Sequence, residues 1–128
     1  MTADELAVAV GAAAANELDS ALNRIRHCAG QLTDEQMWQR SRPGLNSVGN
    51  LVLHLSGNLR QWIVAGIGGA PDVRNRPAEF AERGPISKRD LLNQLVRTDP
   101  GTFRCRRNQI DSSIGGADKK NWSVDFRL

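Results

Sequence analysis

One histidine in this sequence could do chemistry, because it stands among amide side chains at helical spacing. His54, Asn58 and Gln61 follow one another at intervals of four and three residues. A helix would therefore place them on one face, together with Asn50 and Gly57. There an imidazole could ligate a metal ion while the neighbouring amides hold a ligand or substrate by hydrogen bonds. The same spacing also suits a core histidine that is hydrogen-bonded to Asn50 or Asn58, and the sequence leaves both interpretations open.

The element that must position His54 is a helix from about residue 46 to residue 66. Asn46 and Ser47 offer side-chain oxygens that can cap the free amides of its first turn. A glycine cluster at 66–69 and Pro71 should end it. Apolar residues recur every three or four positions, and this stripe is predicted to face the core: Val48, Leu51, Leu55, Leu59 and Trp62.

Two further long helices are predicted, one before and one after this helix in the sequence. The first spans about residues 4 to 31, and its apolar stripe alternates steps of four and three from Leu18 to Leu32. Thr33 and Gln36 then form a capping box that predicts a short helical turn carrying Met37 and Trp38 inward. A later helix begins after Ser87 and presents Leu91, Leu92, Leu95 and Val96. Since no segment alternates as a strand would, the fold class is all-α, an antiparallel helix bundle.

The 128 residues should form one domain, with a helix-bundle core over 1–96 and a poorly patterned C-terminal tail over 97–128. Acidic and basic side chains balance over residues 1–96, so the net charge of +3 comes from the tail. Residues 68–86 are predicted to be a connecting loop. Its charges alternate in sign, which is typical of a solvated, internally paired segment, although loops of this length usually cover something.

Several functions are disfavoured by composition. No apolar run is long enough to cross a membrane, and the N-terminus lacks the basic head of a secretory signal, so a cytoplasmic location is expected. Cys28 and Cys105 are too far apart for a zinc knuckle and are expected to be free thiols. The tail's basic residues could meet nucleic-acid phosphates, but a solvated tail is favoured: Arg104, Arg106, Arg107, Lys119 and Lys120.

The segment from Leu32 to about Leu95 resembles the DinB-like superfamily, in a branch of small bacterial proteins. The matching stretches are QLTDEQMW at 31–38, NSVGNLVLHL at 46–55, GNLRQWI at 57–63, RPAEF at 76–80 and RGPI at 83–86. The resemblance implies a four-helix bundle, often dimeric, in which three histidines bind a divalent metal, commonly zinc or nickel. It also implies metal-dependent chemistry of a thiol transferase or hydrolase-like kind.

His54 matches the first of those three ligands, but no histidine follows it in this sequence. The other histidine, His27, does not match a ligand position and suits the surface near a helix C-terminus. One imidazole does not hold zinc, and carboxylates of the tail such as Asp111, Asp118 or Asp125 would make a weaker site. We therefore expect a metal-site-deficient chain with no tightly bound metal.

The resemblance also implies that the bundle is incomplete, lacking the helix that carries the later histidines. A truncation, a shifted reading frame or a real short variant would each produce this ending. Loss of that helix would leave Leu51 and Leu55 uncovered. Self-association would cover them, so a homo-oligomer is expected. The alternative function is accordingly a non-catalytic, self-associating helical bundle, and nucleic-acid binding is the less favoured one.

Overall fold

A computed structural model describes residues 1–98 of the chain, and the described part is helical throughout its regular elements. The expected all-α fold is therefore confirmed. In chain order the elements are α1 (Ala3–Gly30), α2 (Asp34–Trp38), α3 (Val48–Leu59), the π-helix η1 (Arg60–Ile67), α4 (Arg76–Ala81) and α5 (Lys88–Thr98). The predicted tail from residue 99 onward lies outside the described residues.

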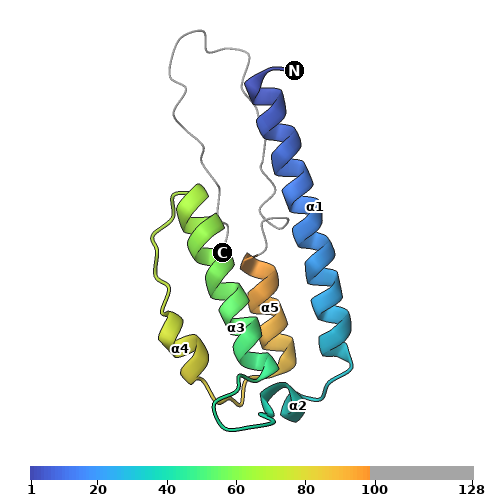
Figure 1. The fold of residues 1–128 in the computed structure, drawn as a ribbon, viewed down its shortest axis with the longest axis vertical. Helices are drawn as coiled ribbons and strands as arrows, with labels where there is room; N and C mark the ends of the chain where they lie inside the picture. The colour runs from blue at the N-terminus through green and yellow to red at the C-terminus, as the bar shows by residue number, and fades with distance from the viewer. Residues whose placement is uncertain (99–128) are drawn as a thin grey trace.

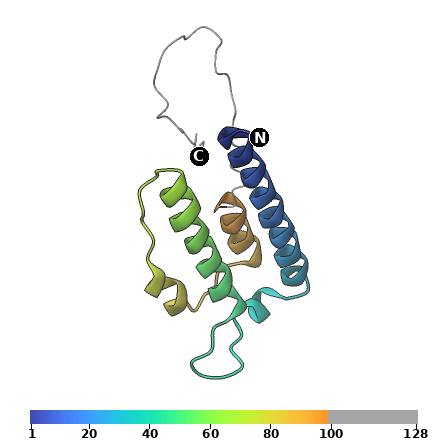
Figure 2. The same ribbon diagram turned by 45° about the horizontal axis from the view of Figure 1, so that its top comes forward.

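The long helices α1, α3 with η1, and α5 form the bundle, while α2 lies at one end of it and α4 lies beside α3 (Figure 1). Helix α1 runs antiparallel to both α3 and α5. Helices α3 and α5 run in the same direction, because the connection after η1 returns along the side of α3 before α5 begins (Figure 2). The predicted long loop at 68–86 is this return connection, and it contains α4, which packs against α3.

Each of the first three helices starts with a reciprocal capping box, in which two side chains satisfy each other's backbone amides. In α1 the partners are Thr2 and Glu5, and in α2 they are Thr33 and Gln36, as predicted. In α3 the hydroxyl of Ser47 accepts from the amide of Asn50, whose side chain accepts in return. The starts of these helices are therefore determined locally by sequence.

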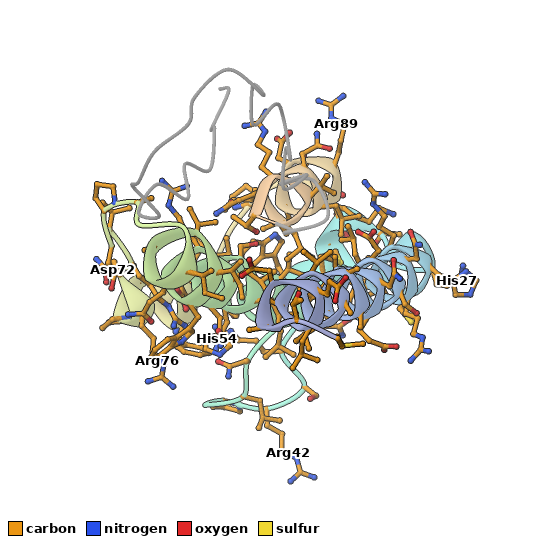
Figure 3. The ribbon with its side chains drawn as sticks, turned by 90° about the horizontal axis from the view of Figure 1, so that it is seen from above. His27, Arg42, His54, Asp72, Arg76 and Arg89 are labelled. Carbon is orange, nitrogen blue, oxygen red and sulfur yellow. The ribbon has the colours of Figure 1, made fainter. Side chains whose placement is uncertain are left out.

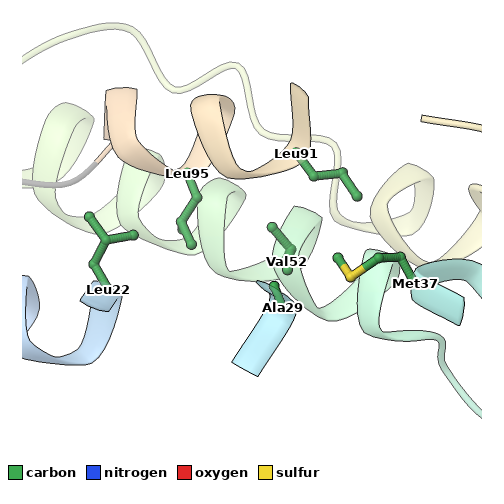
Figure 4. Close-up of a cluster of buried hydrophobic side chains, with 6 residues drawn as sticks. All are labelled: Leu22, Ala29, Met37, Val52, Leu91 and Leu95. Carbon is green, nitrogen blue, oxygen red and sulfur yellow. The ribbon is translucent and has the colours of Figure 1, made fainter. Parts of the chain in front are cut away.

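The hydrophobic core lies where α1, α3 and α5 meet, close to the end at which α2 crosses (Figure 4). Met37 projects from α2 into this cluster and is fully buried, as the capping box predicted. Val52 is the member from α3, and the others come from α1 and α5: Leu22, Ala29, Leu91 and Leu95. Burial of each leucine, valine or methionine side chain in this cluster stabilises the fold by about 1.5–3 kcal/mol.

The core face predicted for the helix at 46–66, which the structure divides into α3 and η1, is wrong in four of its five positions. Val48, Leu51, Leu55 and Trp62 are exposed, and only Leu59 packs against the core. The buried face of α3 is instead formed by small and polar residues, namely Gly49, Asn50, Val52 and Ser56. The regular spacing correctly predicted a helix, but spacing alone could not show which side the other helices cover.

The helix that carries His54 does not stop at Leu59 but widens into η1, in which backbone amides donate to carbonyls five residues earlier. The predicted end at Gly66 is close to the observed end at Ile67. The amide of Gly68 donates to the carbonyl of Ile63 at 2.9 Å, which closes the last wide turn. Residues 48–67 thus form one continuous helical rod, and its pitch changes after Leu59.

Trp38 fixes the end of the bundle at which α3 begins. Its indole lies against Gly49 of α3 and Gly84 of the following connection, where a Cβ would come within about 2.9 Å of the ring. The indole nitrogen donates to the carbonyl of Ile86 at 2.8 Å. Gly84 also has φ of 76°, a conformation that favours glycine. The connection after α4 is therefore held to α2 and α3 by one aromatic side chain.

Candidate functional site

His54 lies in the middle of α3 on the side that faces α4, and its side chain is 26 % exposed. Figure 3 shows it on the same side of the molecule as Asp72 and Arg76, with His27 at the far end. The His54 ring lies 4.9 Å from the ring of Phe80, centroid to centroid. The guanidinium of Arg76 covers the same phenyl ring at 5.3 Å. One side of the imidazole is thus packed while the ring still reaches solvent.

Glu79 of α4 and Arg74 of the preceding loop form a bonded cluster with His54. The Nδ1 atom of His54 is 3.0 Å from Oε2 of Glu79. Arg74 donates from Nε to Oε1 at 2.8 Å and from Nη2 to Oε2 at 3.2 Å, so the guanidinium binds the carboxylate at two points. The side chains of Arg74 and Glu79 are only 7 % and 10 % exposed. This is a largely desolvated ion pair placed against a histidine.

The hydrogen-bond partners define the tautomer of His54. A carboxylate oxygen can only accept, so its 3.0 Å approach to Nδ1 favours a proton on that nitrogen. Nη2 of Arg74, which can only donate, also lies 3.1 Å from Nδ1 and taken alone would favour an unprotonated nitrogen there. Because Nη2 has Oε2 of Glu79 as an acceptor at 3.2 Å, it does not need Nδ1 as one. We therefore assign the Nδ1–H form to the neutral ring. This form leaves the electron pair of Nε2 free to accept a proton or to bind a metal ion.

Gln61 extends the cluster along the rod. Nη1 of Arg74 donates to its side-chain oxygen at 2.8 Å, and its amide nitrogen donates to Asp72 at 2.9 Å. Asp72 also accepts from the backbone amide of Arg74 at 3.1 Å. Gln61 belongs to the first turn of η1, so the wide helix carries this contact. Gln61 and His54 do not contact each other but both contact Arg74.

The charges of the cluster shift the pKa values of its members. Burial raises the pKa of Glu79, but the hydrogen bonds from Arg74 and His54 lower it more, so it lies below its ordinary value of 4.5. The hydrogen bond to Glu79 raises the pKa of Arg74 further above its ordinary value. The hydrogen bonds from Gln61 and from the Arg74 amide lower the pKa of Asp72. Glu79 is therefore ionised at neutral pH.

Gly57 makes the close approach of this ion pair to α3 feasible. A Cβ at this position would overlap Oε1 of Glu79 and would lie 3.2 Å from Nε of Arg74. Gly57 stands one turn after His54, so the missing side chain opens the helix surface beside the imidazole. The sequence placed Gly57 on the polar face of the helix without indicating this function.

Asn50 holds α4 in place one turn before His54. Its amide nitrogen donates to the carbonyls of Glu79 and Glu82, both at 2.9 Å. Its oxygen accepts from Arg40 at 2.6 Å and from the hydroxyl of Ser47 at 2.7 Å. Asn50 is fully buried and every polar atom of its side chain is bonded. A hydrogen bond to His54, which the core-histidine alternative assigned to Asn50 or Asn58, is not among the contacts of Asn50.

The connection at 68–86 is internally paired, as predicted, but it is not simply solvated. The side chains of Arg74 and Glu79 lie against α3 with little exposure, and these two are the site residues that sequence reasoning missed. One local signal was present: Asn75 caps α4 by accepting from the amide of Ala78. Asn58, the remaining candidate partner of His54, is half-buried and is not among the contacts of the cluster.

The donor set of the described residues does not fit a complete metal site. No group of three histidine, cysteine, aspartate or glutamate side chains converges within residues 1–98. Both carboxylate oxygens of Glu79 accept hydrogen bonds from the guanidinium of Arg74, so a cationic side chain already occupies this carboxylate. Nε2 of His54 is left as a single coordinating atom, whereas a stable zinc site takes three or four protein ligands.

The remaining sequence candidates lie away from this cluster. His27 is exposed in the last turn of α1, as expected, and Cys28 next to it is an exposed free thiol. Cys105, Asp111, Asp118, Asp125 and the basic tail residues lie outside the described part. Within residues 1–98, no helix combines the length and apolar character that a membrane crossing needs.

These features define an all-α helix-bundle protein with a histidine, glutamate and arginine cluster between α3 and the connection that follows it. The model of one protein family, described as a protein of unknown function (DUF1572), matches residues 11–111. The chain belongs to the DUF1572 family. Neither a search of curated proteins nor a search of solved structures found a match.

Proposed function

We propose that this protein is a DinB-like, metal-binding bundle in which His54 is one ligand of a divalent ion such as zinc or nickel. The supporting observation is the 3.0 Å contact of Nδ1 with Glu79. Metal-ligating histidines nearly always donate their second ring N–H to a carboxylate, a carbonyl or water, which orients the ring and raises its basicity. Arg74 in turn holds the carboxylate. This cluster thus supplies the outer support of a metal ligand.

The remaining ligands come from outside residues 1–98 of the same protomer, because Nε2 of His54 is the sole coordinating atom that this cluster offers. A metal ion bound at Nε2 of His54 would act as a Lewis acid or activate a bound water. The role of this chain's own residues is to orient the imidazole, keep Nδ1 protonated and maintain a negative charge beside it. On its own, a single imidazole binds such an ion weakly.

The test is a calorimetric titration of the full chain with Ni²⁺ and with Zn²⁺. Wild type and His27→Ala should show the same saturable binding, and His54→Ala should abolish it. Glu79→Gln should weaken binding by about 10- to 100-fold, the usual effect of losing a second-shell partner. A wild type without saturable binding, or a His54→Ala protein that binds as wild type does, would refute the proposal.

A second candidate function is a self-associating bundle without catalysis. It is supported by the exposed apolar side chains of α3, since soluble monomers seldom leave a contiguous apolar stripe in water. Sedimentation of the full chain distinguishes the two: this candidate requires association that is unaffected by His54→Ala and by chelators. A monomer at all concentrations would eliminate it.

A further inference from the structure

Arg76 is held beside His54 with its hydrogen-bond donors unused. Its guanidinium lies 5.3 Å from the centroid of the Phe80 ring, and that ring lies 4.9 Å from the ring of His54. At most the sum of these two distances separates the guanidinium from the imidazole, and Figure 3 shows both side chains on the same side of the molecule. Arg76 is exposed, and within residues 1–98 its N–H groups contact no acceptor.

The other arginines around this site use their donors within the protein. The guanidinium of Arg74 is bound to Glu79 at two points. Arg40 donates to the side chain of Asn50 at 2.6 Å. Arg76 differs from both, because an aromatic ring covers its guanidinium while the N–H groups remain free. A guanidinium that is already held in this way loses less conformational freedom when it binds an anion, which favours binding.

We propose that Arg76 binds the anionic group of a small ligand that lies beside His54, and that this group is a carboxylate or a phosphate. A planar guanidinium presents parallel N–H groups, which match two oxygens of either group. The acidic side chains of the site do not compete for it. Both oxygens of Glu79 are bonded to Arg74, and within residues 1–98 no ion pair links Arg76 to Asp72.

The position of Arg76 gives the site a preference for anionic ligands. The Phe80 ring lies between the guanidinium and the imidazole, so a molecule whose anionic group is held at Arg76 can extend over this ring to His54. Anionic molecules are then favoured over neutral molecules of the same shape, because only they form charge-assisted hydrogen bonds with the guanidinium. This preference requires no metal ion at His54, so the inference goes beyond the proposed function and is tested separately from it.

The experiment is an NMR titration of the full chain with inorganic phosphate and, separately, with acetate. A chelator is present throughout, and the pH and the ionic strength are kept constant with chloride. The signals followed are the Nε–H of Arg76 and the ring protons of His54. Both should shift saturably with at least one of the two anions, whereas chloride alone should cause no saturable shift. Saturation by phosphate only or by acetate only identifies which anionic group the site takes.

The decisive variant is Arg76→Gln, which should weaken anion binding at least tenfold because the charge-assisted hydrogen bonds are lost. Its matched control is Arg60→Gln, since Arg60 is also exposed and no ring within residues 1–98 lies under its guanidinium. This control should bind as wild type does. Phe80→Leu keeps the charge but removes the ring that holds it, and should weaken binding about two- to fivefold. Circular dichroism should show equal helix content in both arginine variants.

Three results would overturn the inference. The wild type could show no saturable shift with either anion, or Arg76→Gln could bind as tightly as wild type. An equal loss of affinity in Arg60→Gln would show attraction to the overall charge instead of binding at Arg76. The nickel titration remains a separate measurement: a chain that binds Ni²⁺ but neither anion contradicts only this inference. A chain that binds an anion but no Ni²⁺ contradicts only the proposed function.

Discussion

The pair formed by Arg74 and Glu79 should contribute far more to stability than an ordinary surface ion pair. Its two N–O contacts are 2.8 and 3.2 Å, and the side chains are only 7 % and 10 % exposed. Exposed pairs contribute about 0.2–1 kcal/mol, whereas removing one partner of a buried pair costs about 3–5 kcal/mol. The low exposure of these two side chains resembles that of a buried pair, but the pair lies at the edge of the protein, so we place its contribution between the two ranges. We expect Arg74→Met and Glu79→Gln each to cost about 2–3 kcal/mol.

A double-mutant cycle measures the interaction itself. Urea unfolding of the wild type, both single variants and the double variant should give a coupling free energy of about 2 kcal/mol, about a 30-fold change in the unfolding equilibrium. Arg89 and Asp90 provide the matched control, since they are 3.9 Å apart with side chains 84 % and 62 % exposed. The same cycle there should show no measurable coupling. A coupling below about 0.5 kcal/mol for Arg74 and Glu79 would refute the burial argument.

Three other perturbations test the site. Because the pKa of Glu79 in the folded protein lies below its ordinary value of 4.5, its ionised form stabilises the fold at neutral pH. This stability should be lost as the pH falls through 4.5 and below, and melting temperatures of Glu79→Gln should depend less steeply on pH in that range. Gly57→Ala should destabilise by about 1–3 kcal/mol, because its Cβ overlaps the Glu79 carboxylate and moving that carboxylate breaks its bonds to Arg74 and His54, whereas Gly11→Ala, with open space around it, should stabilise α1 by up to about 1 kcal/mol. Asn50→Ala should cost about 3 kcal/mol in urea unfolding, because it leaves the carbonyls of Glu79 and Glu82 without their side-chain donor and removes one acceptor of Arg40, while Asn58→Ala should have little effect.

The helices could be predicted from sequence because their starts depend on neighbouring residues. Thr33 and Gln36 are three positions apart, and their reciprocal hydrogen bonds form without help from the rest of the fold. The predicted first helix at 4–31 agrees with the observed Ala3–Gly30 to one residue at each end. A local rule of capping and spacing was sufficient for these elements.

The orientation of α3 could not be predicted in the same way, because its buried side is not the apolar one. Gly49 is buried because Trp38 packs on it, and Asn50 is buried because backbone carbonyls of α4 satisfy its amide. A prediction that uses only the spacing of apolar residues does not assign a glycine or an asparagine to the core. It favoured Leu51 and Leu55, which the other helices of residues 1–98 do not cover.

Sequence spacing could predict only part of the candidate site, for a related reason. His54 and Gln61 share a helix, so their spacing placed them together. Glu79 follows His54 by 25 positions and reaches it only because the return connection lies along α3. Alternating charges over 68–86 predicted internal pairing, which is confirmed for Arg74 and Glu79, but no local pattern indicated that this pair would be buried against a histidine.

Asn50 couples the unfolding of the start of α3 to the unfolding of α4. The same amide group caps the first turn of α3 and binds the last carbonyls of α4. Neither segment can therefore unfold while the other keeps all its hydrogen bonds. Amide hydrogen exchange would register the two as one cooperative unit, although about 30 positions separate them in the chain. Glu79 belongs to α4, so its backbone is part of this unit.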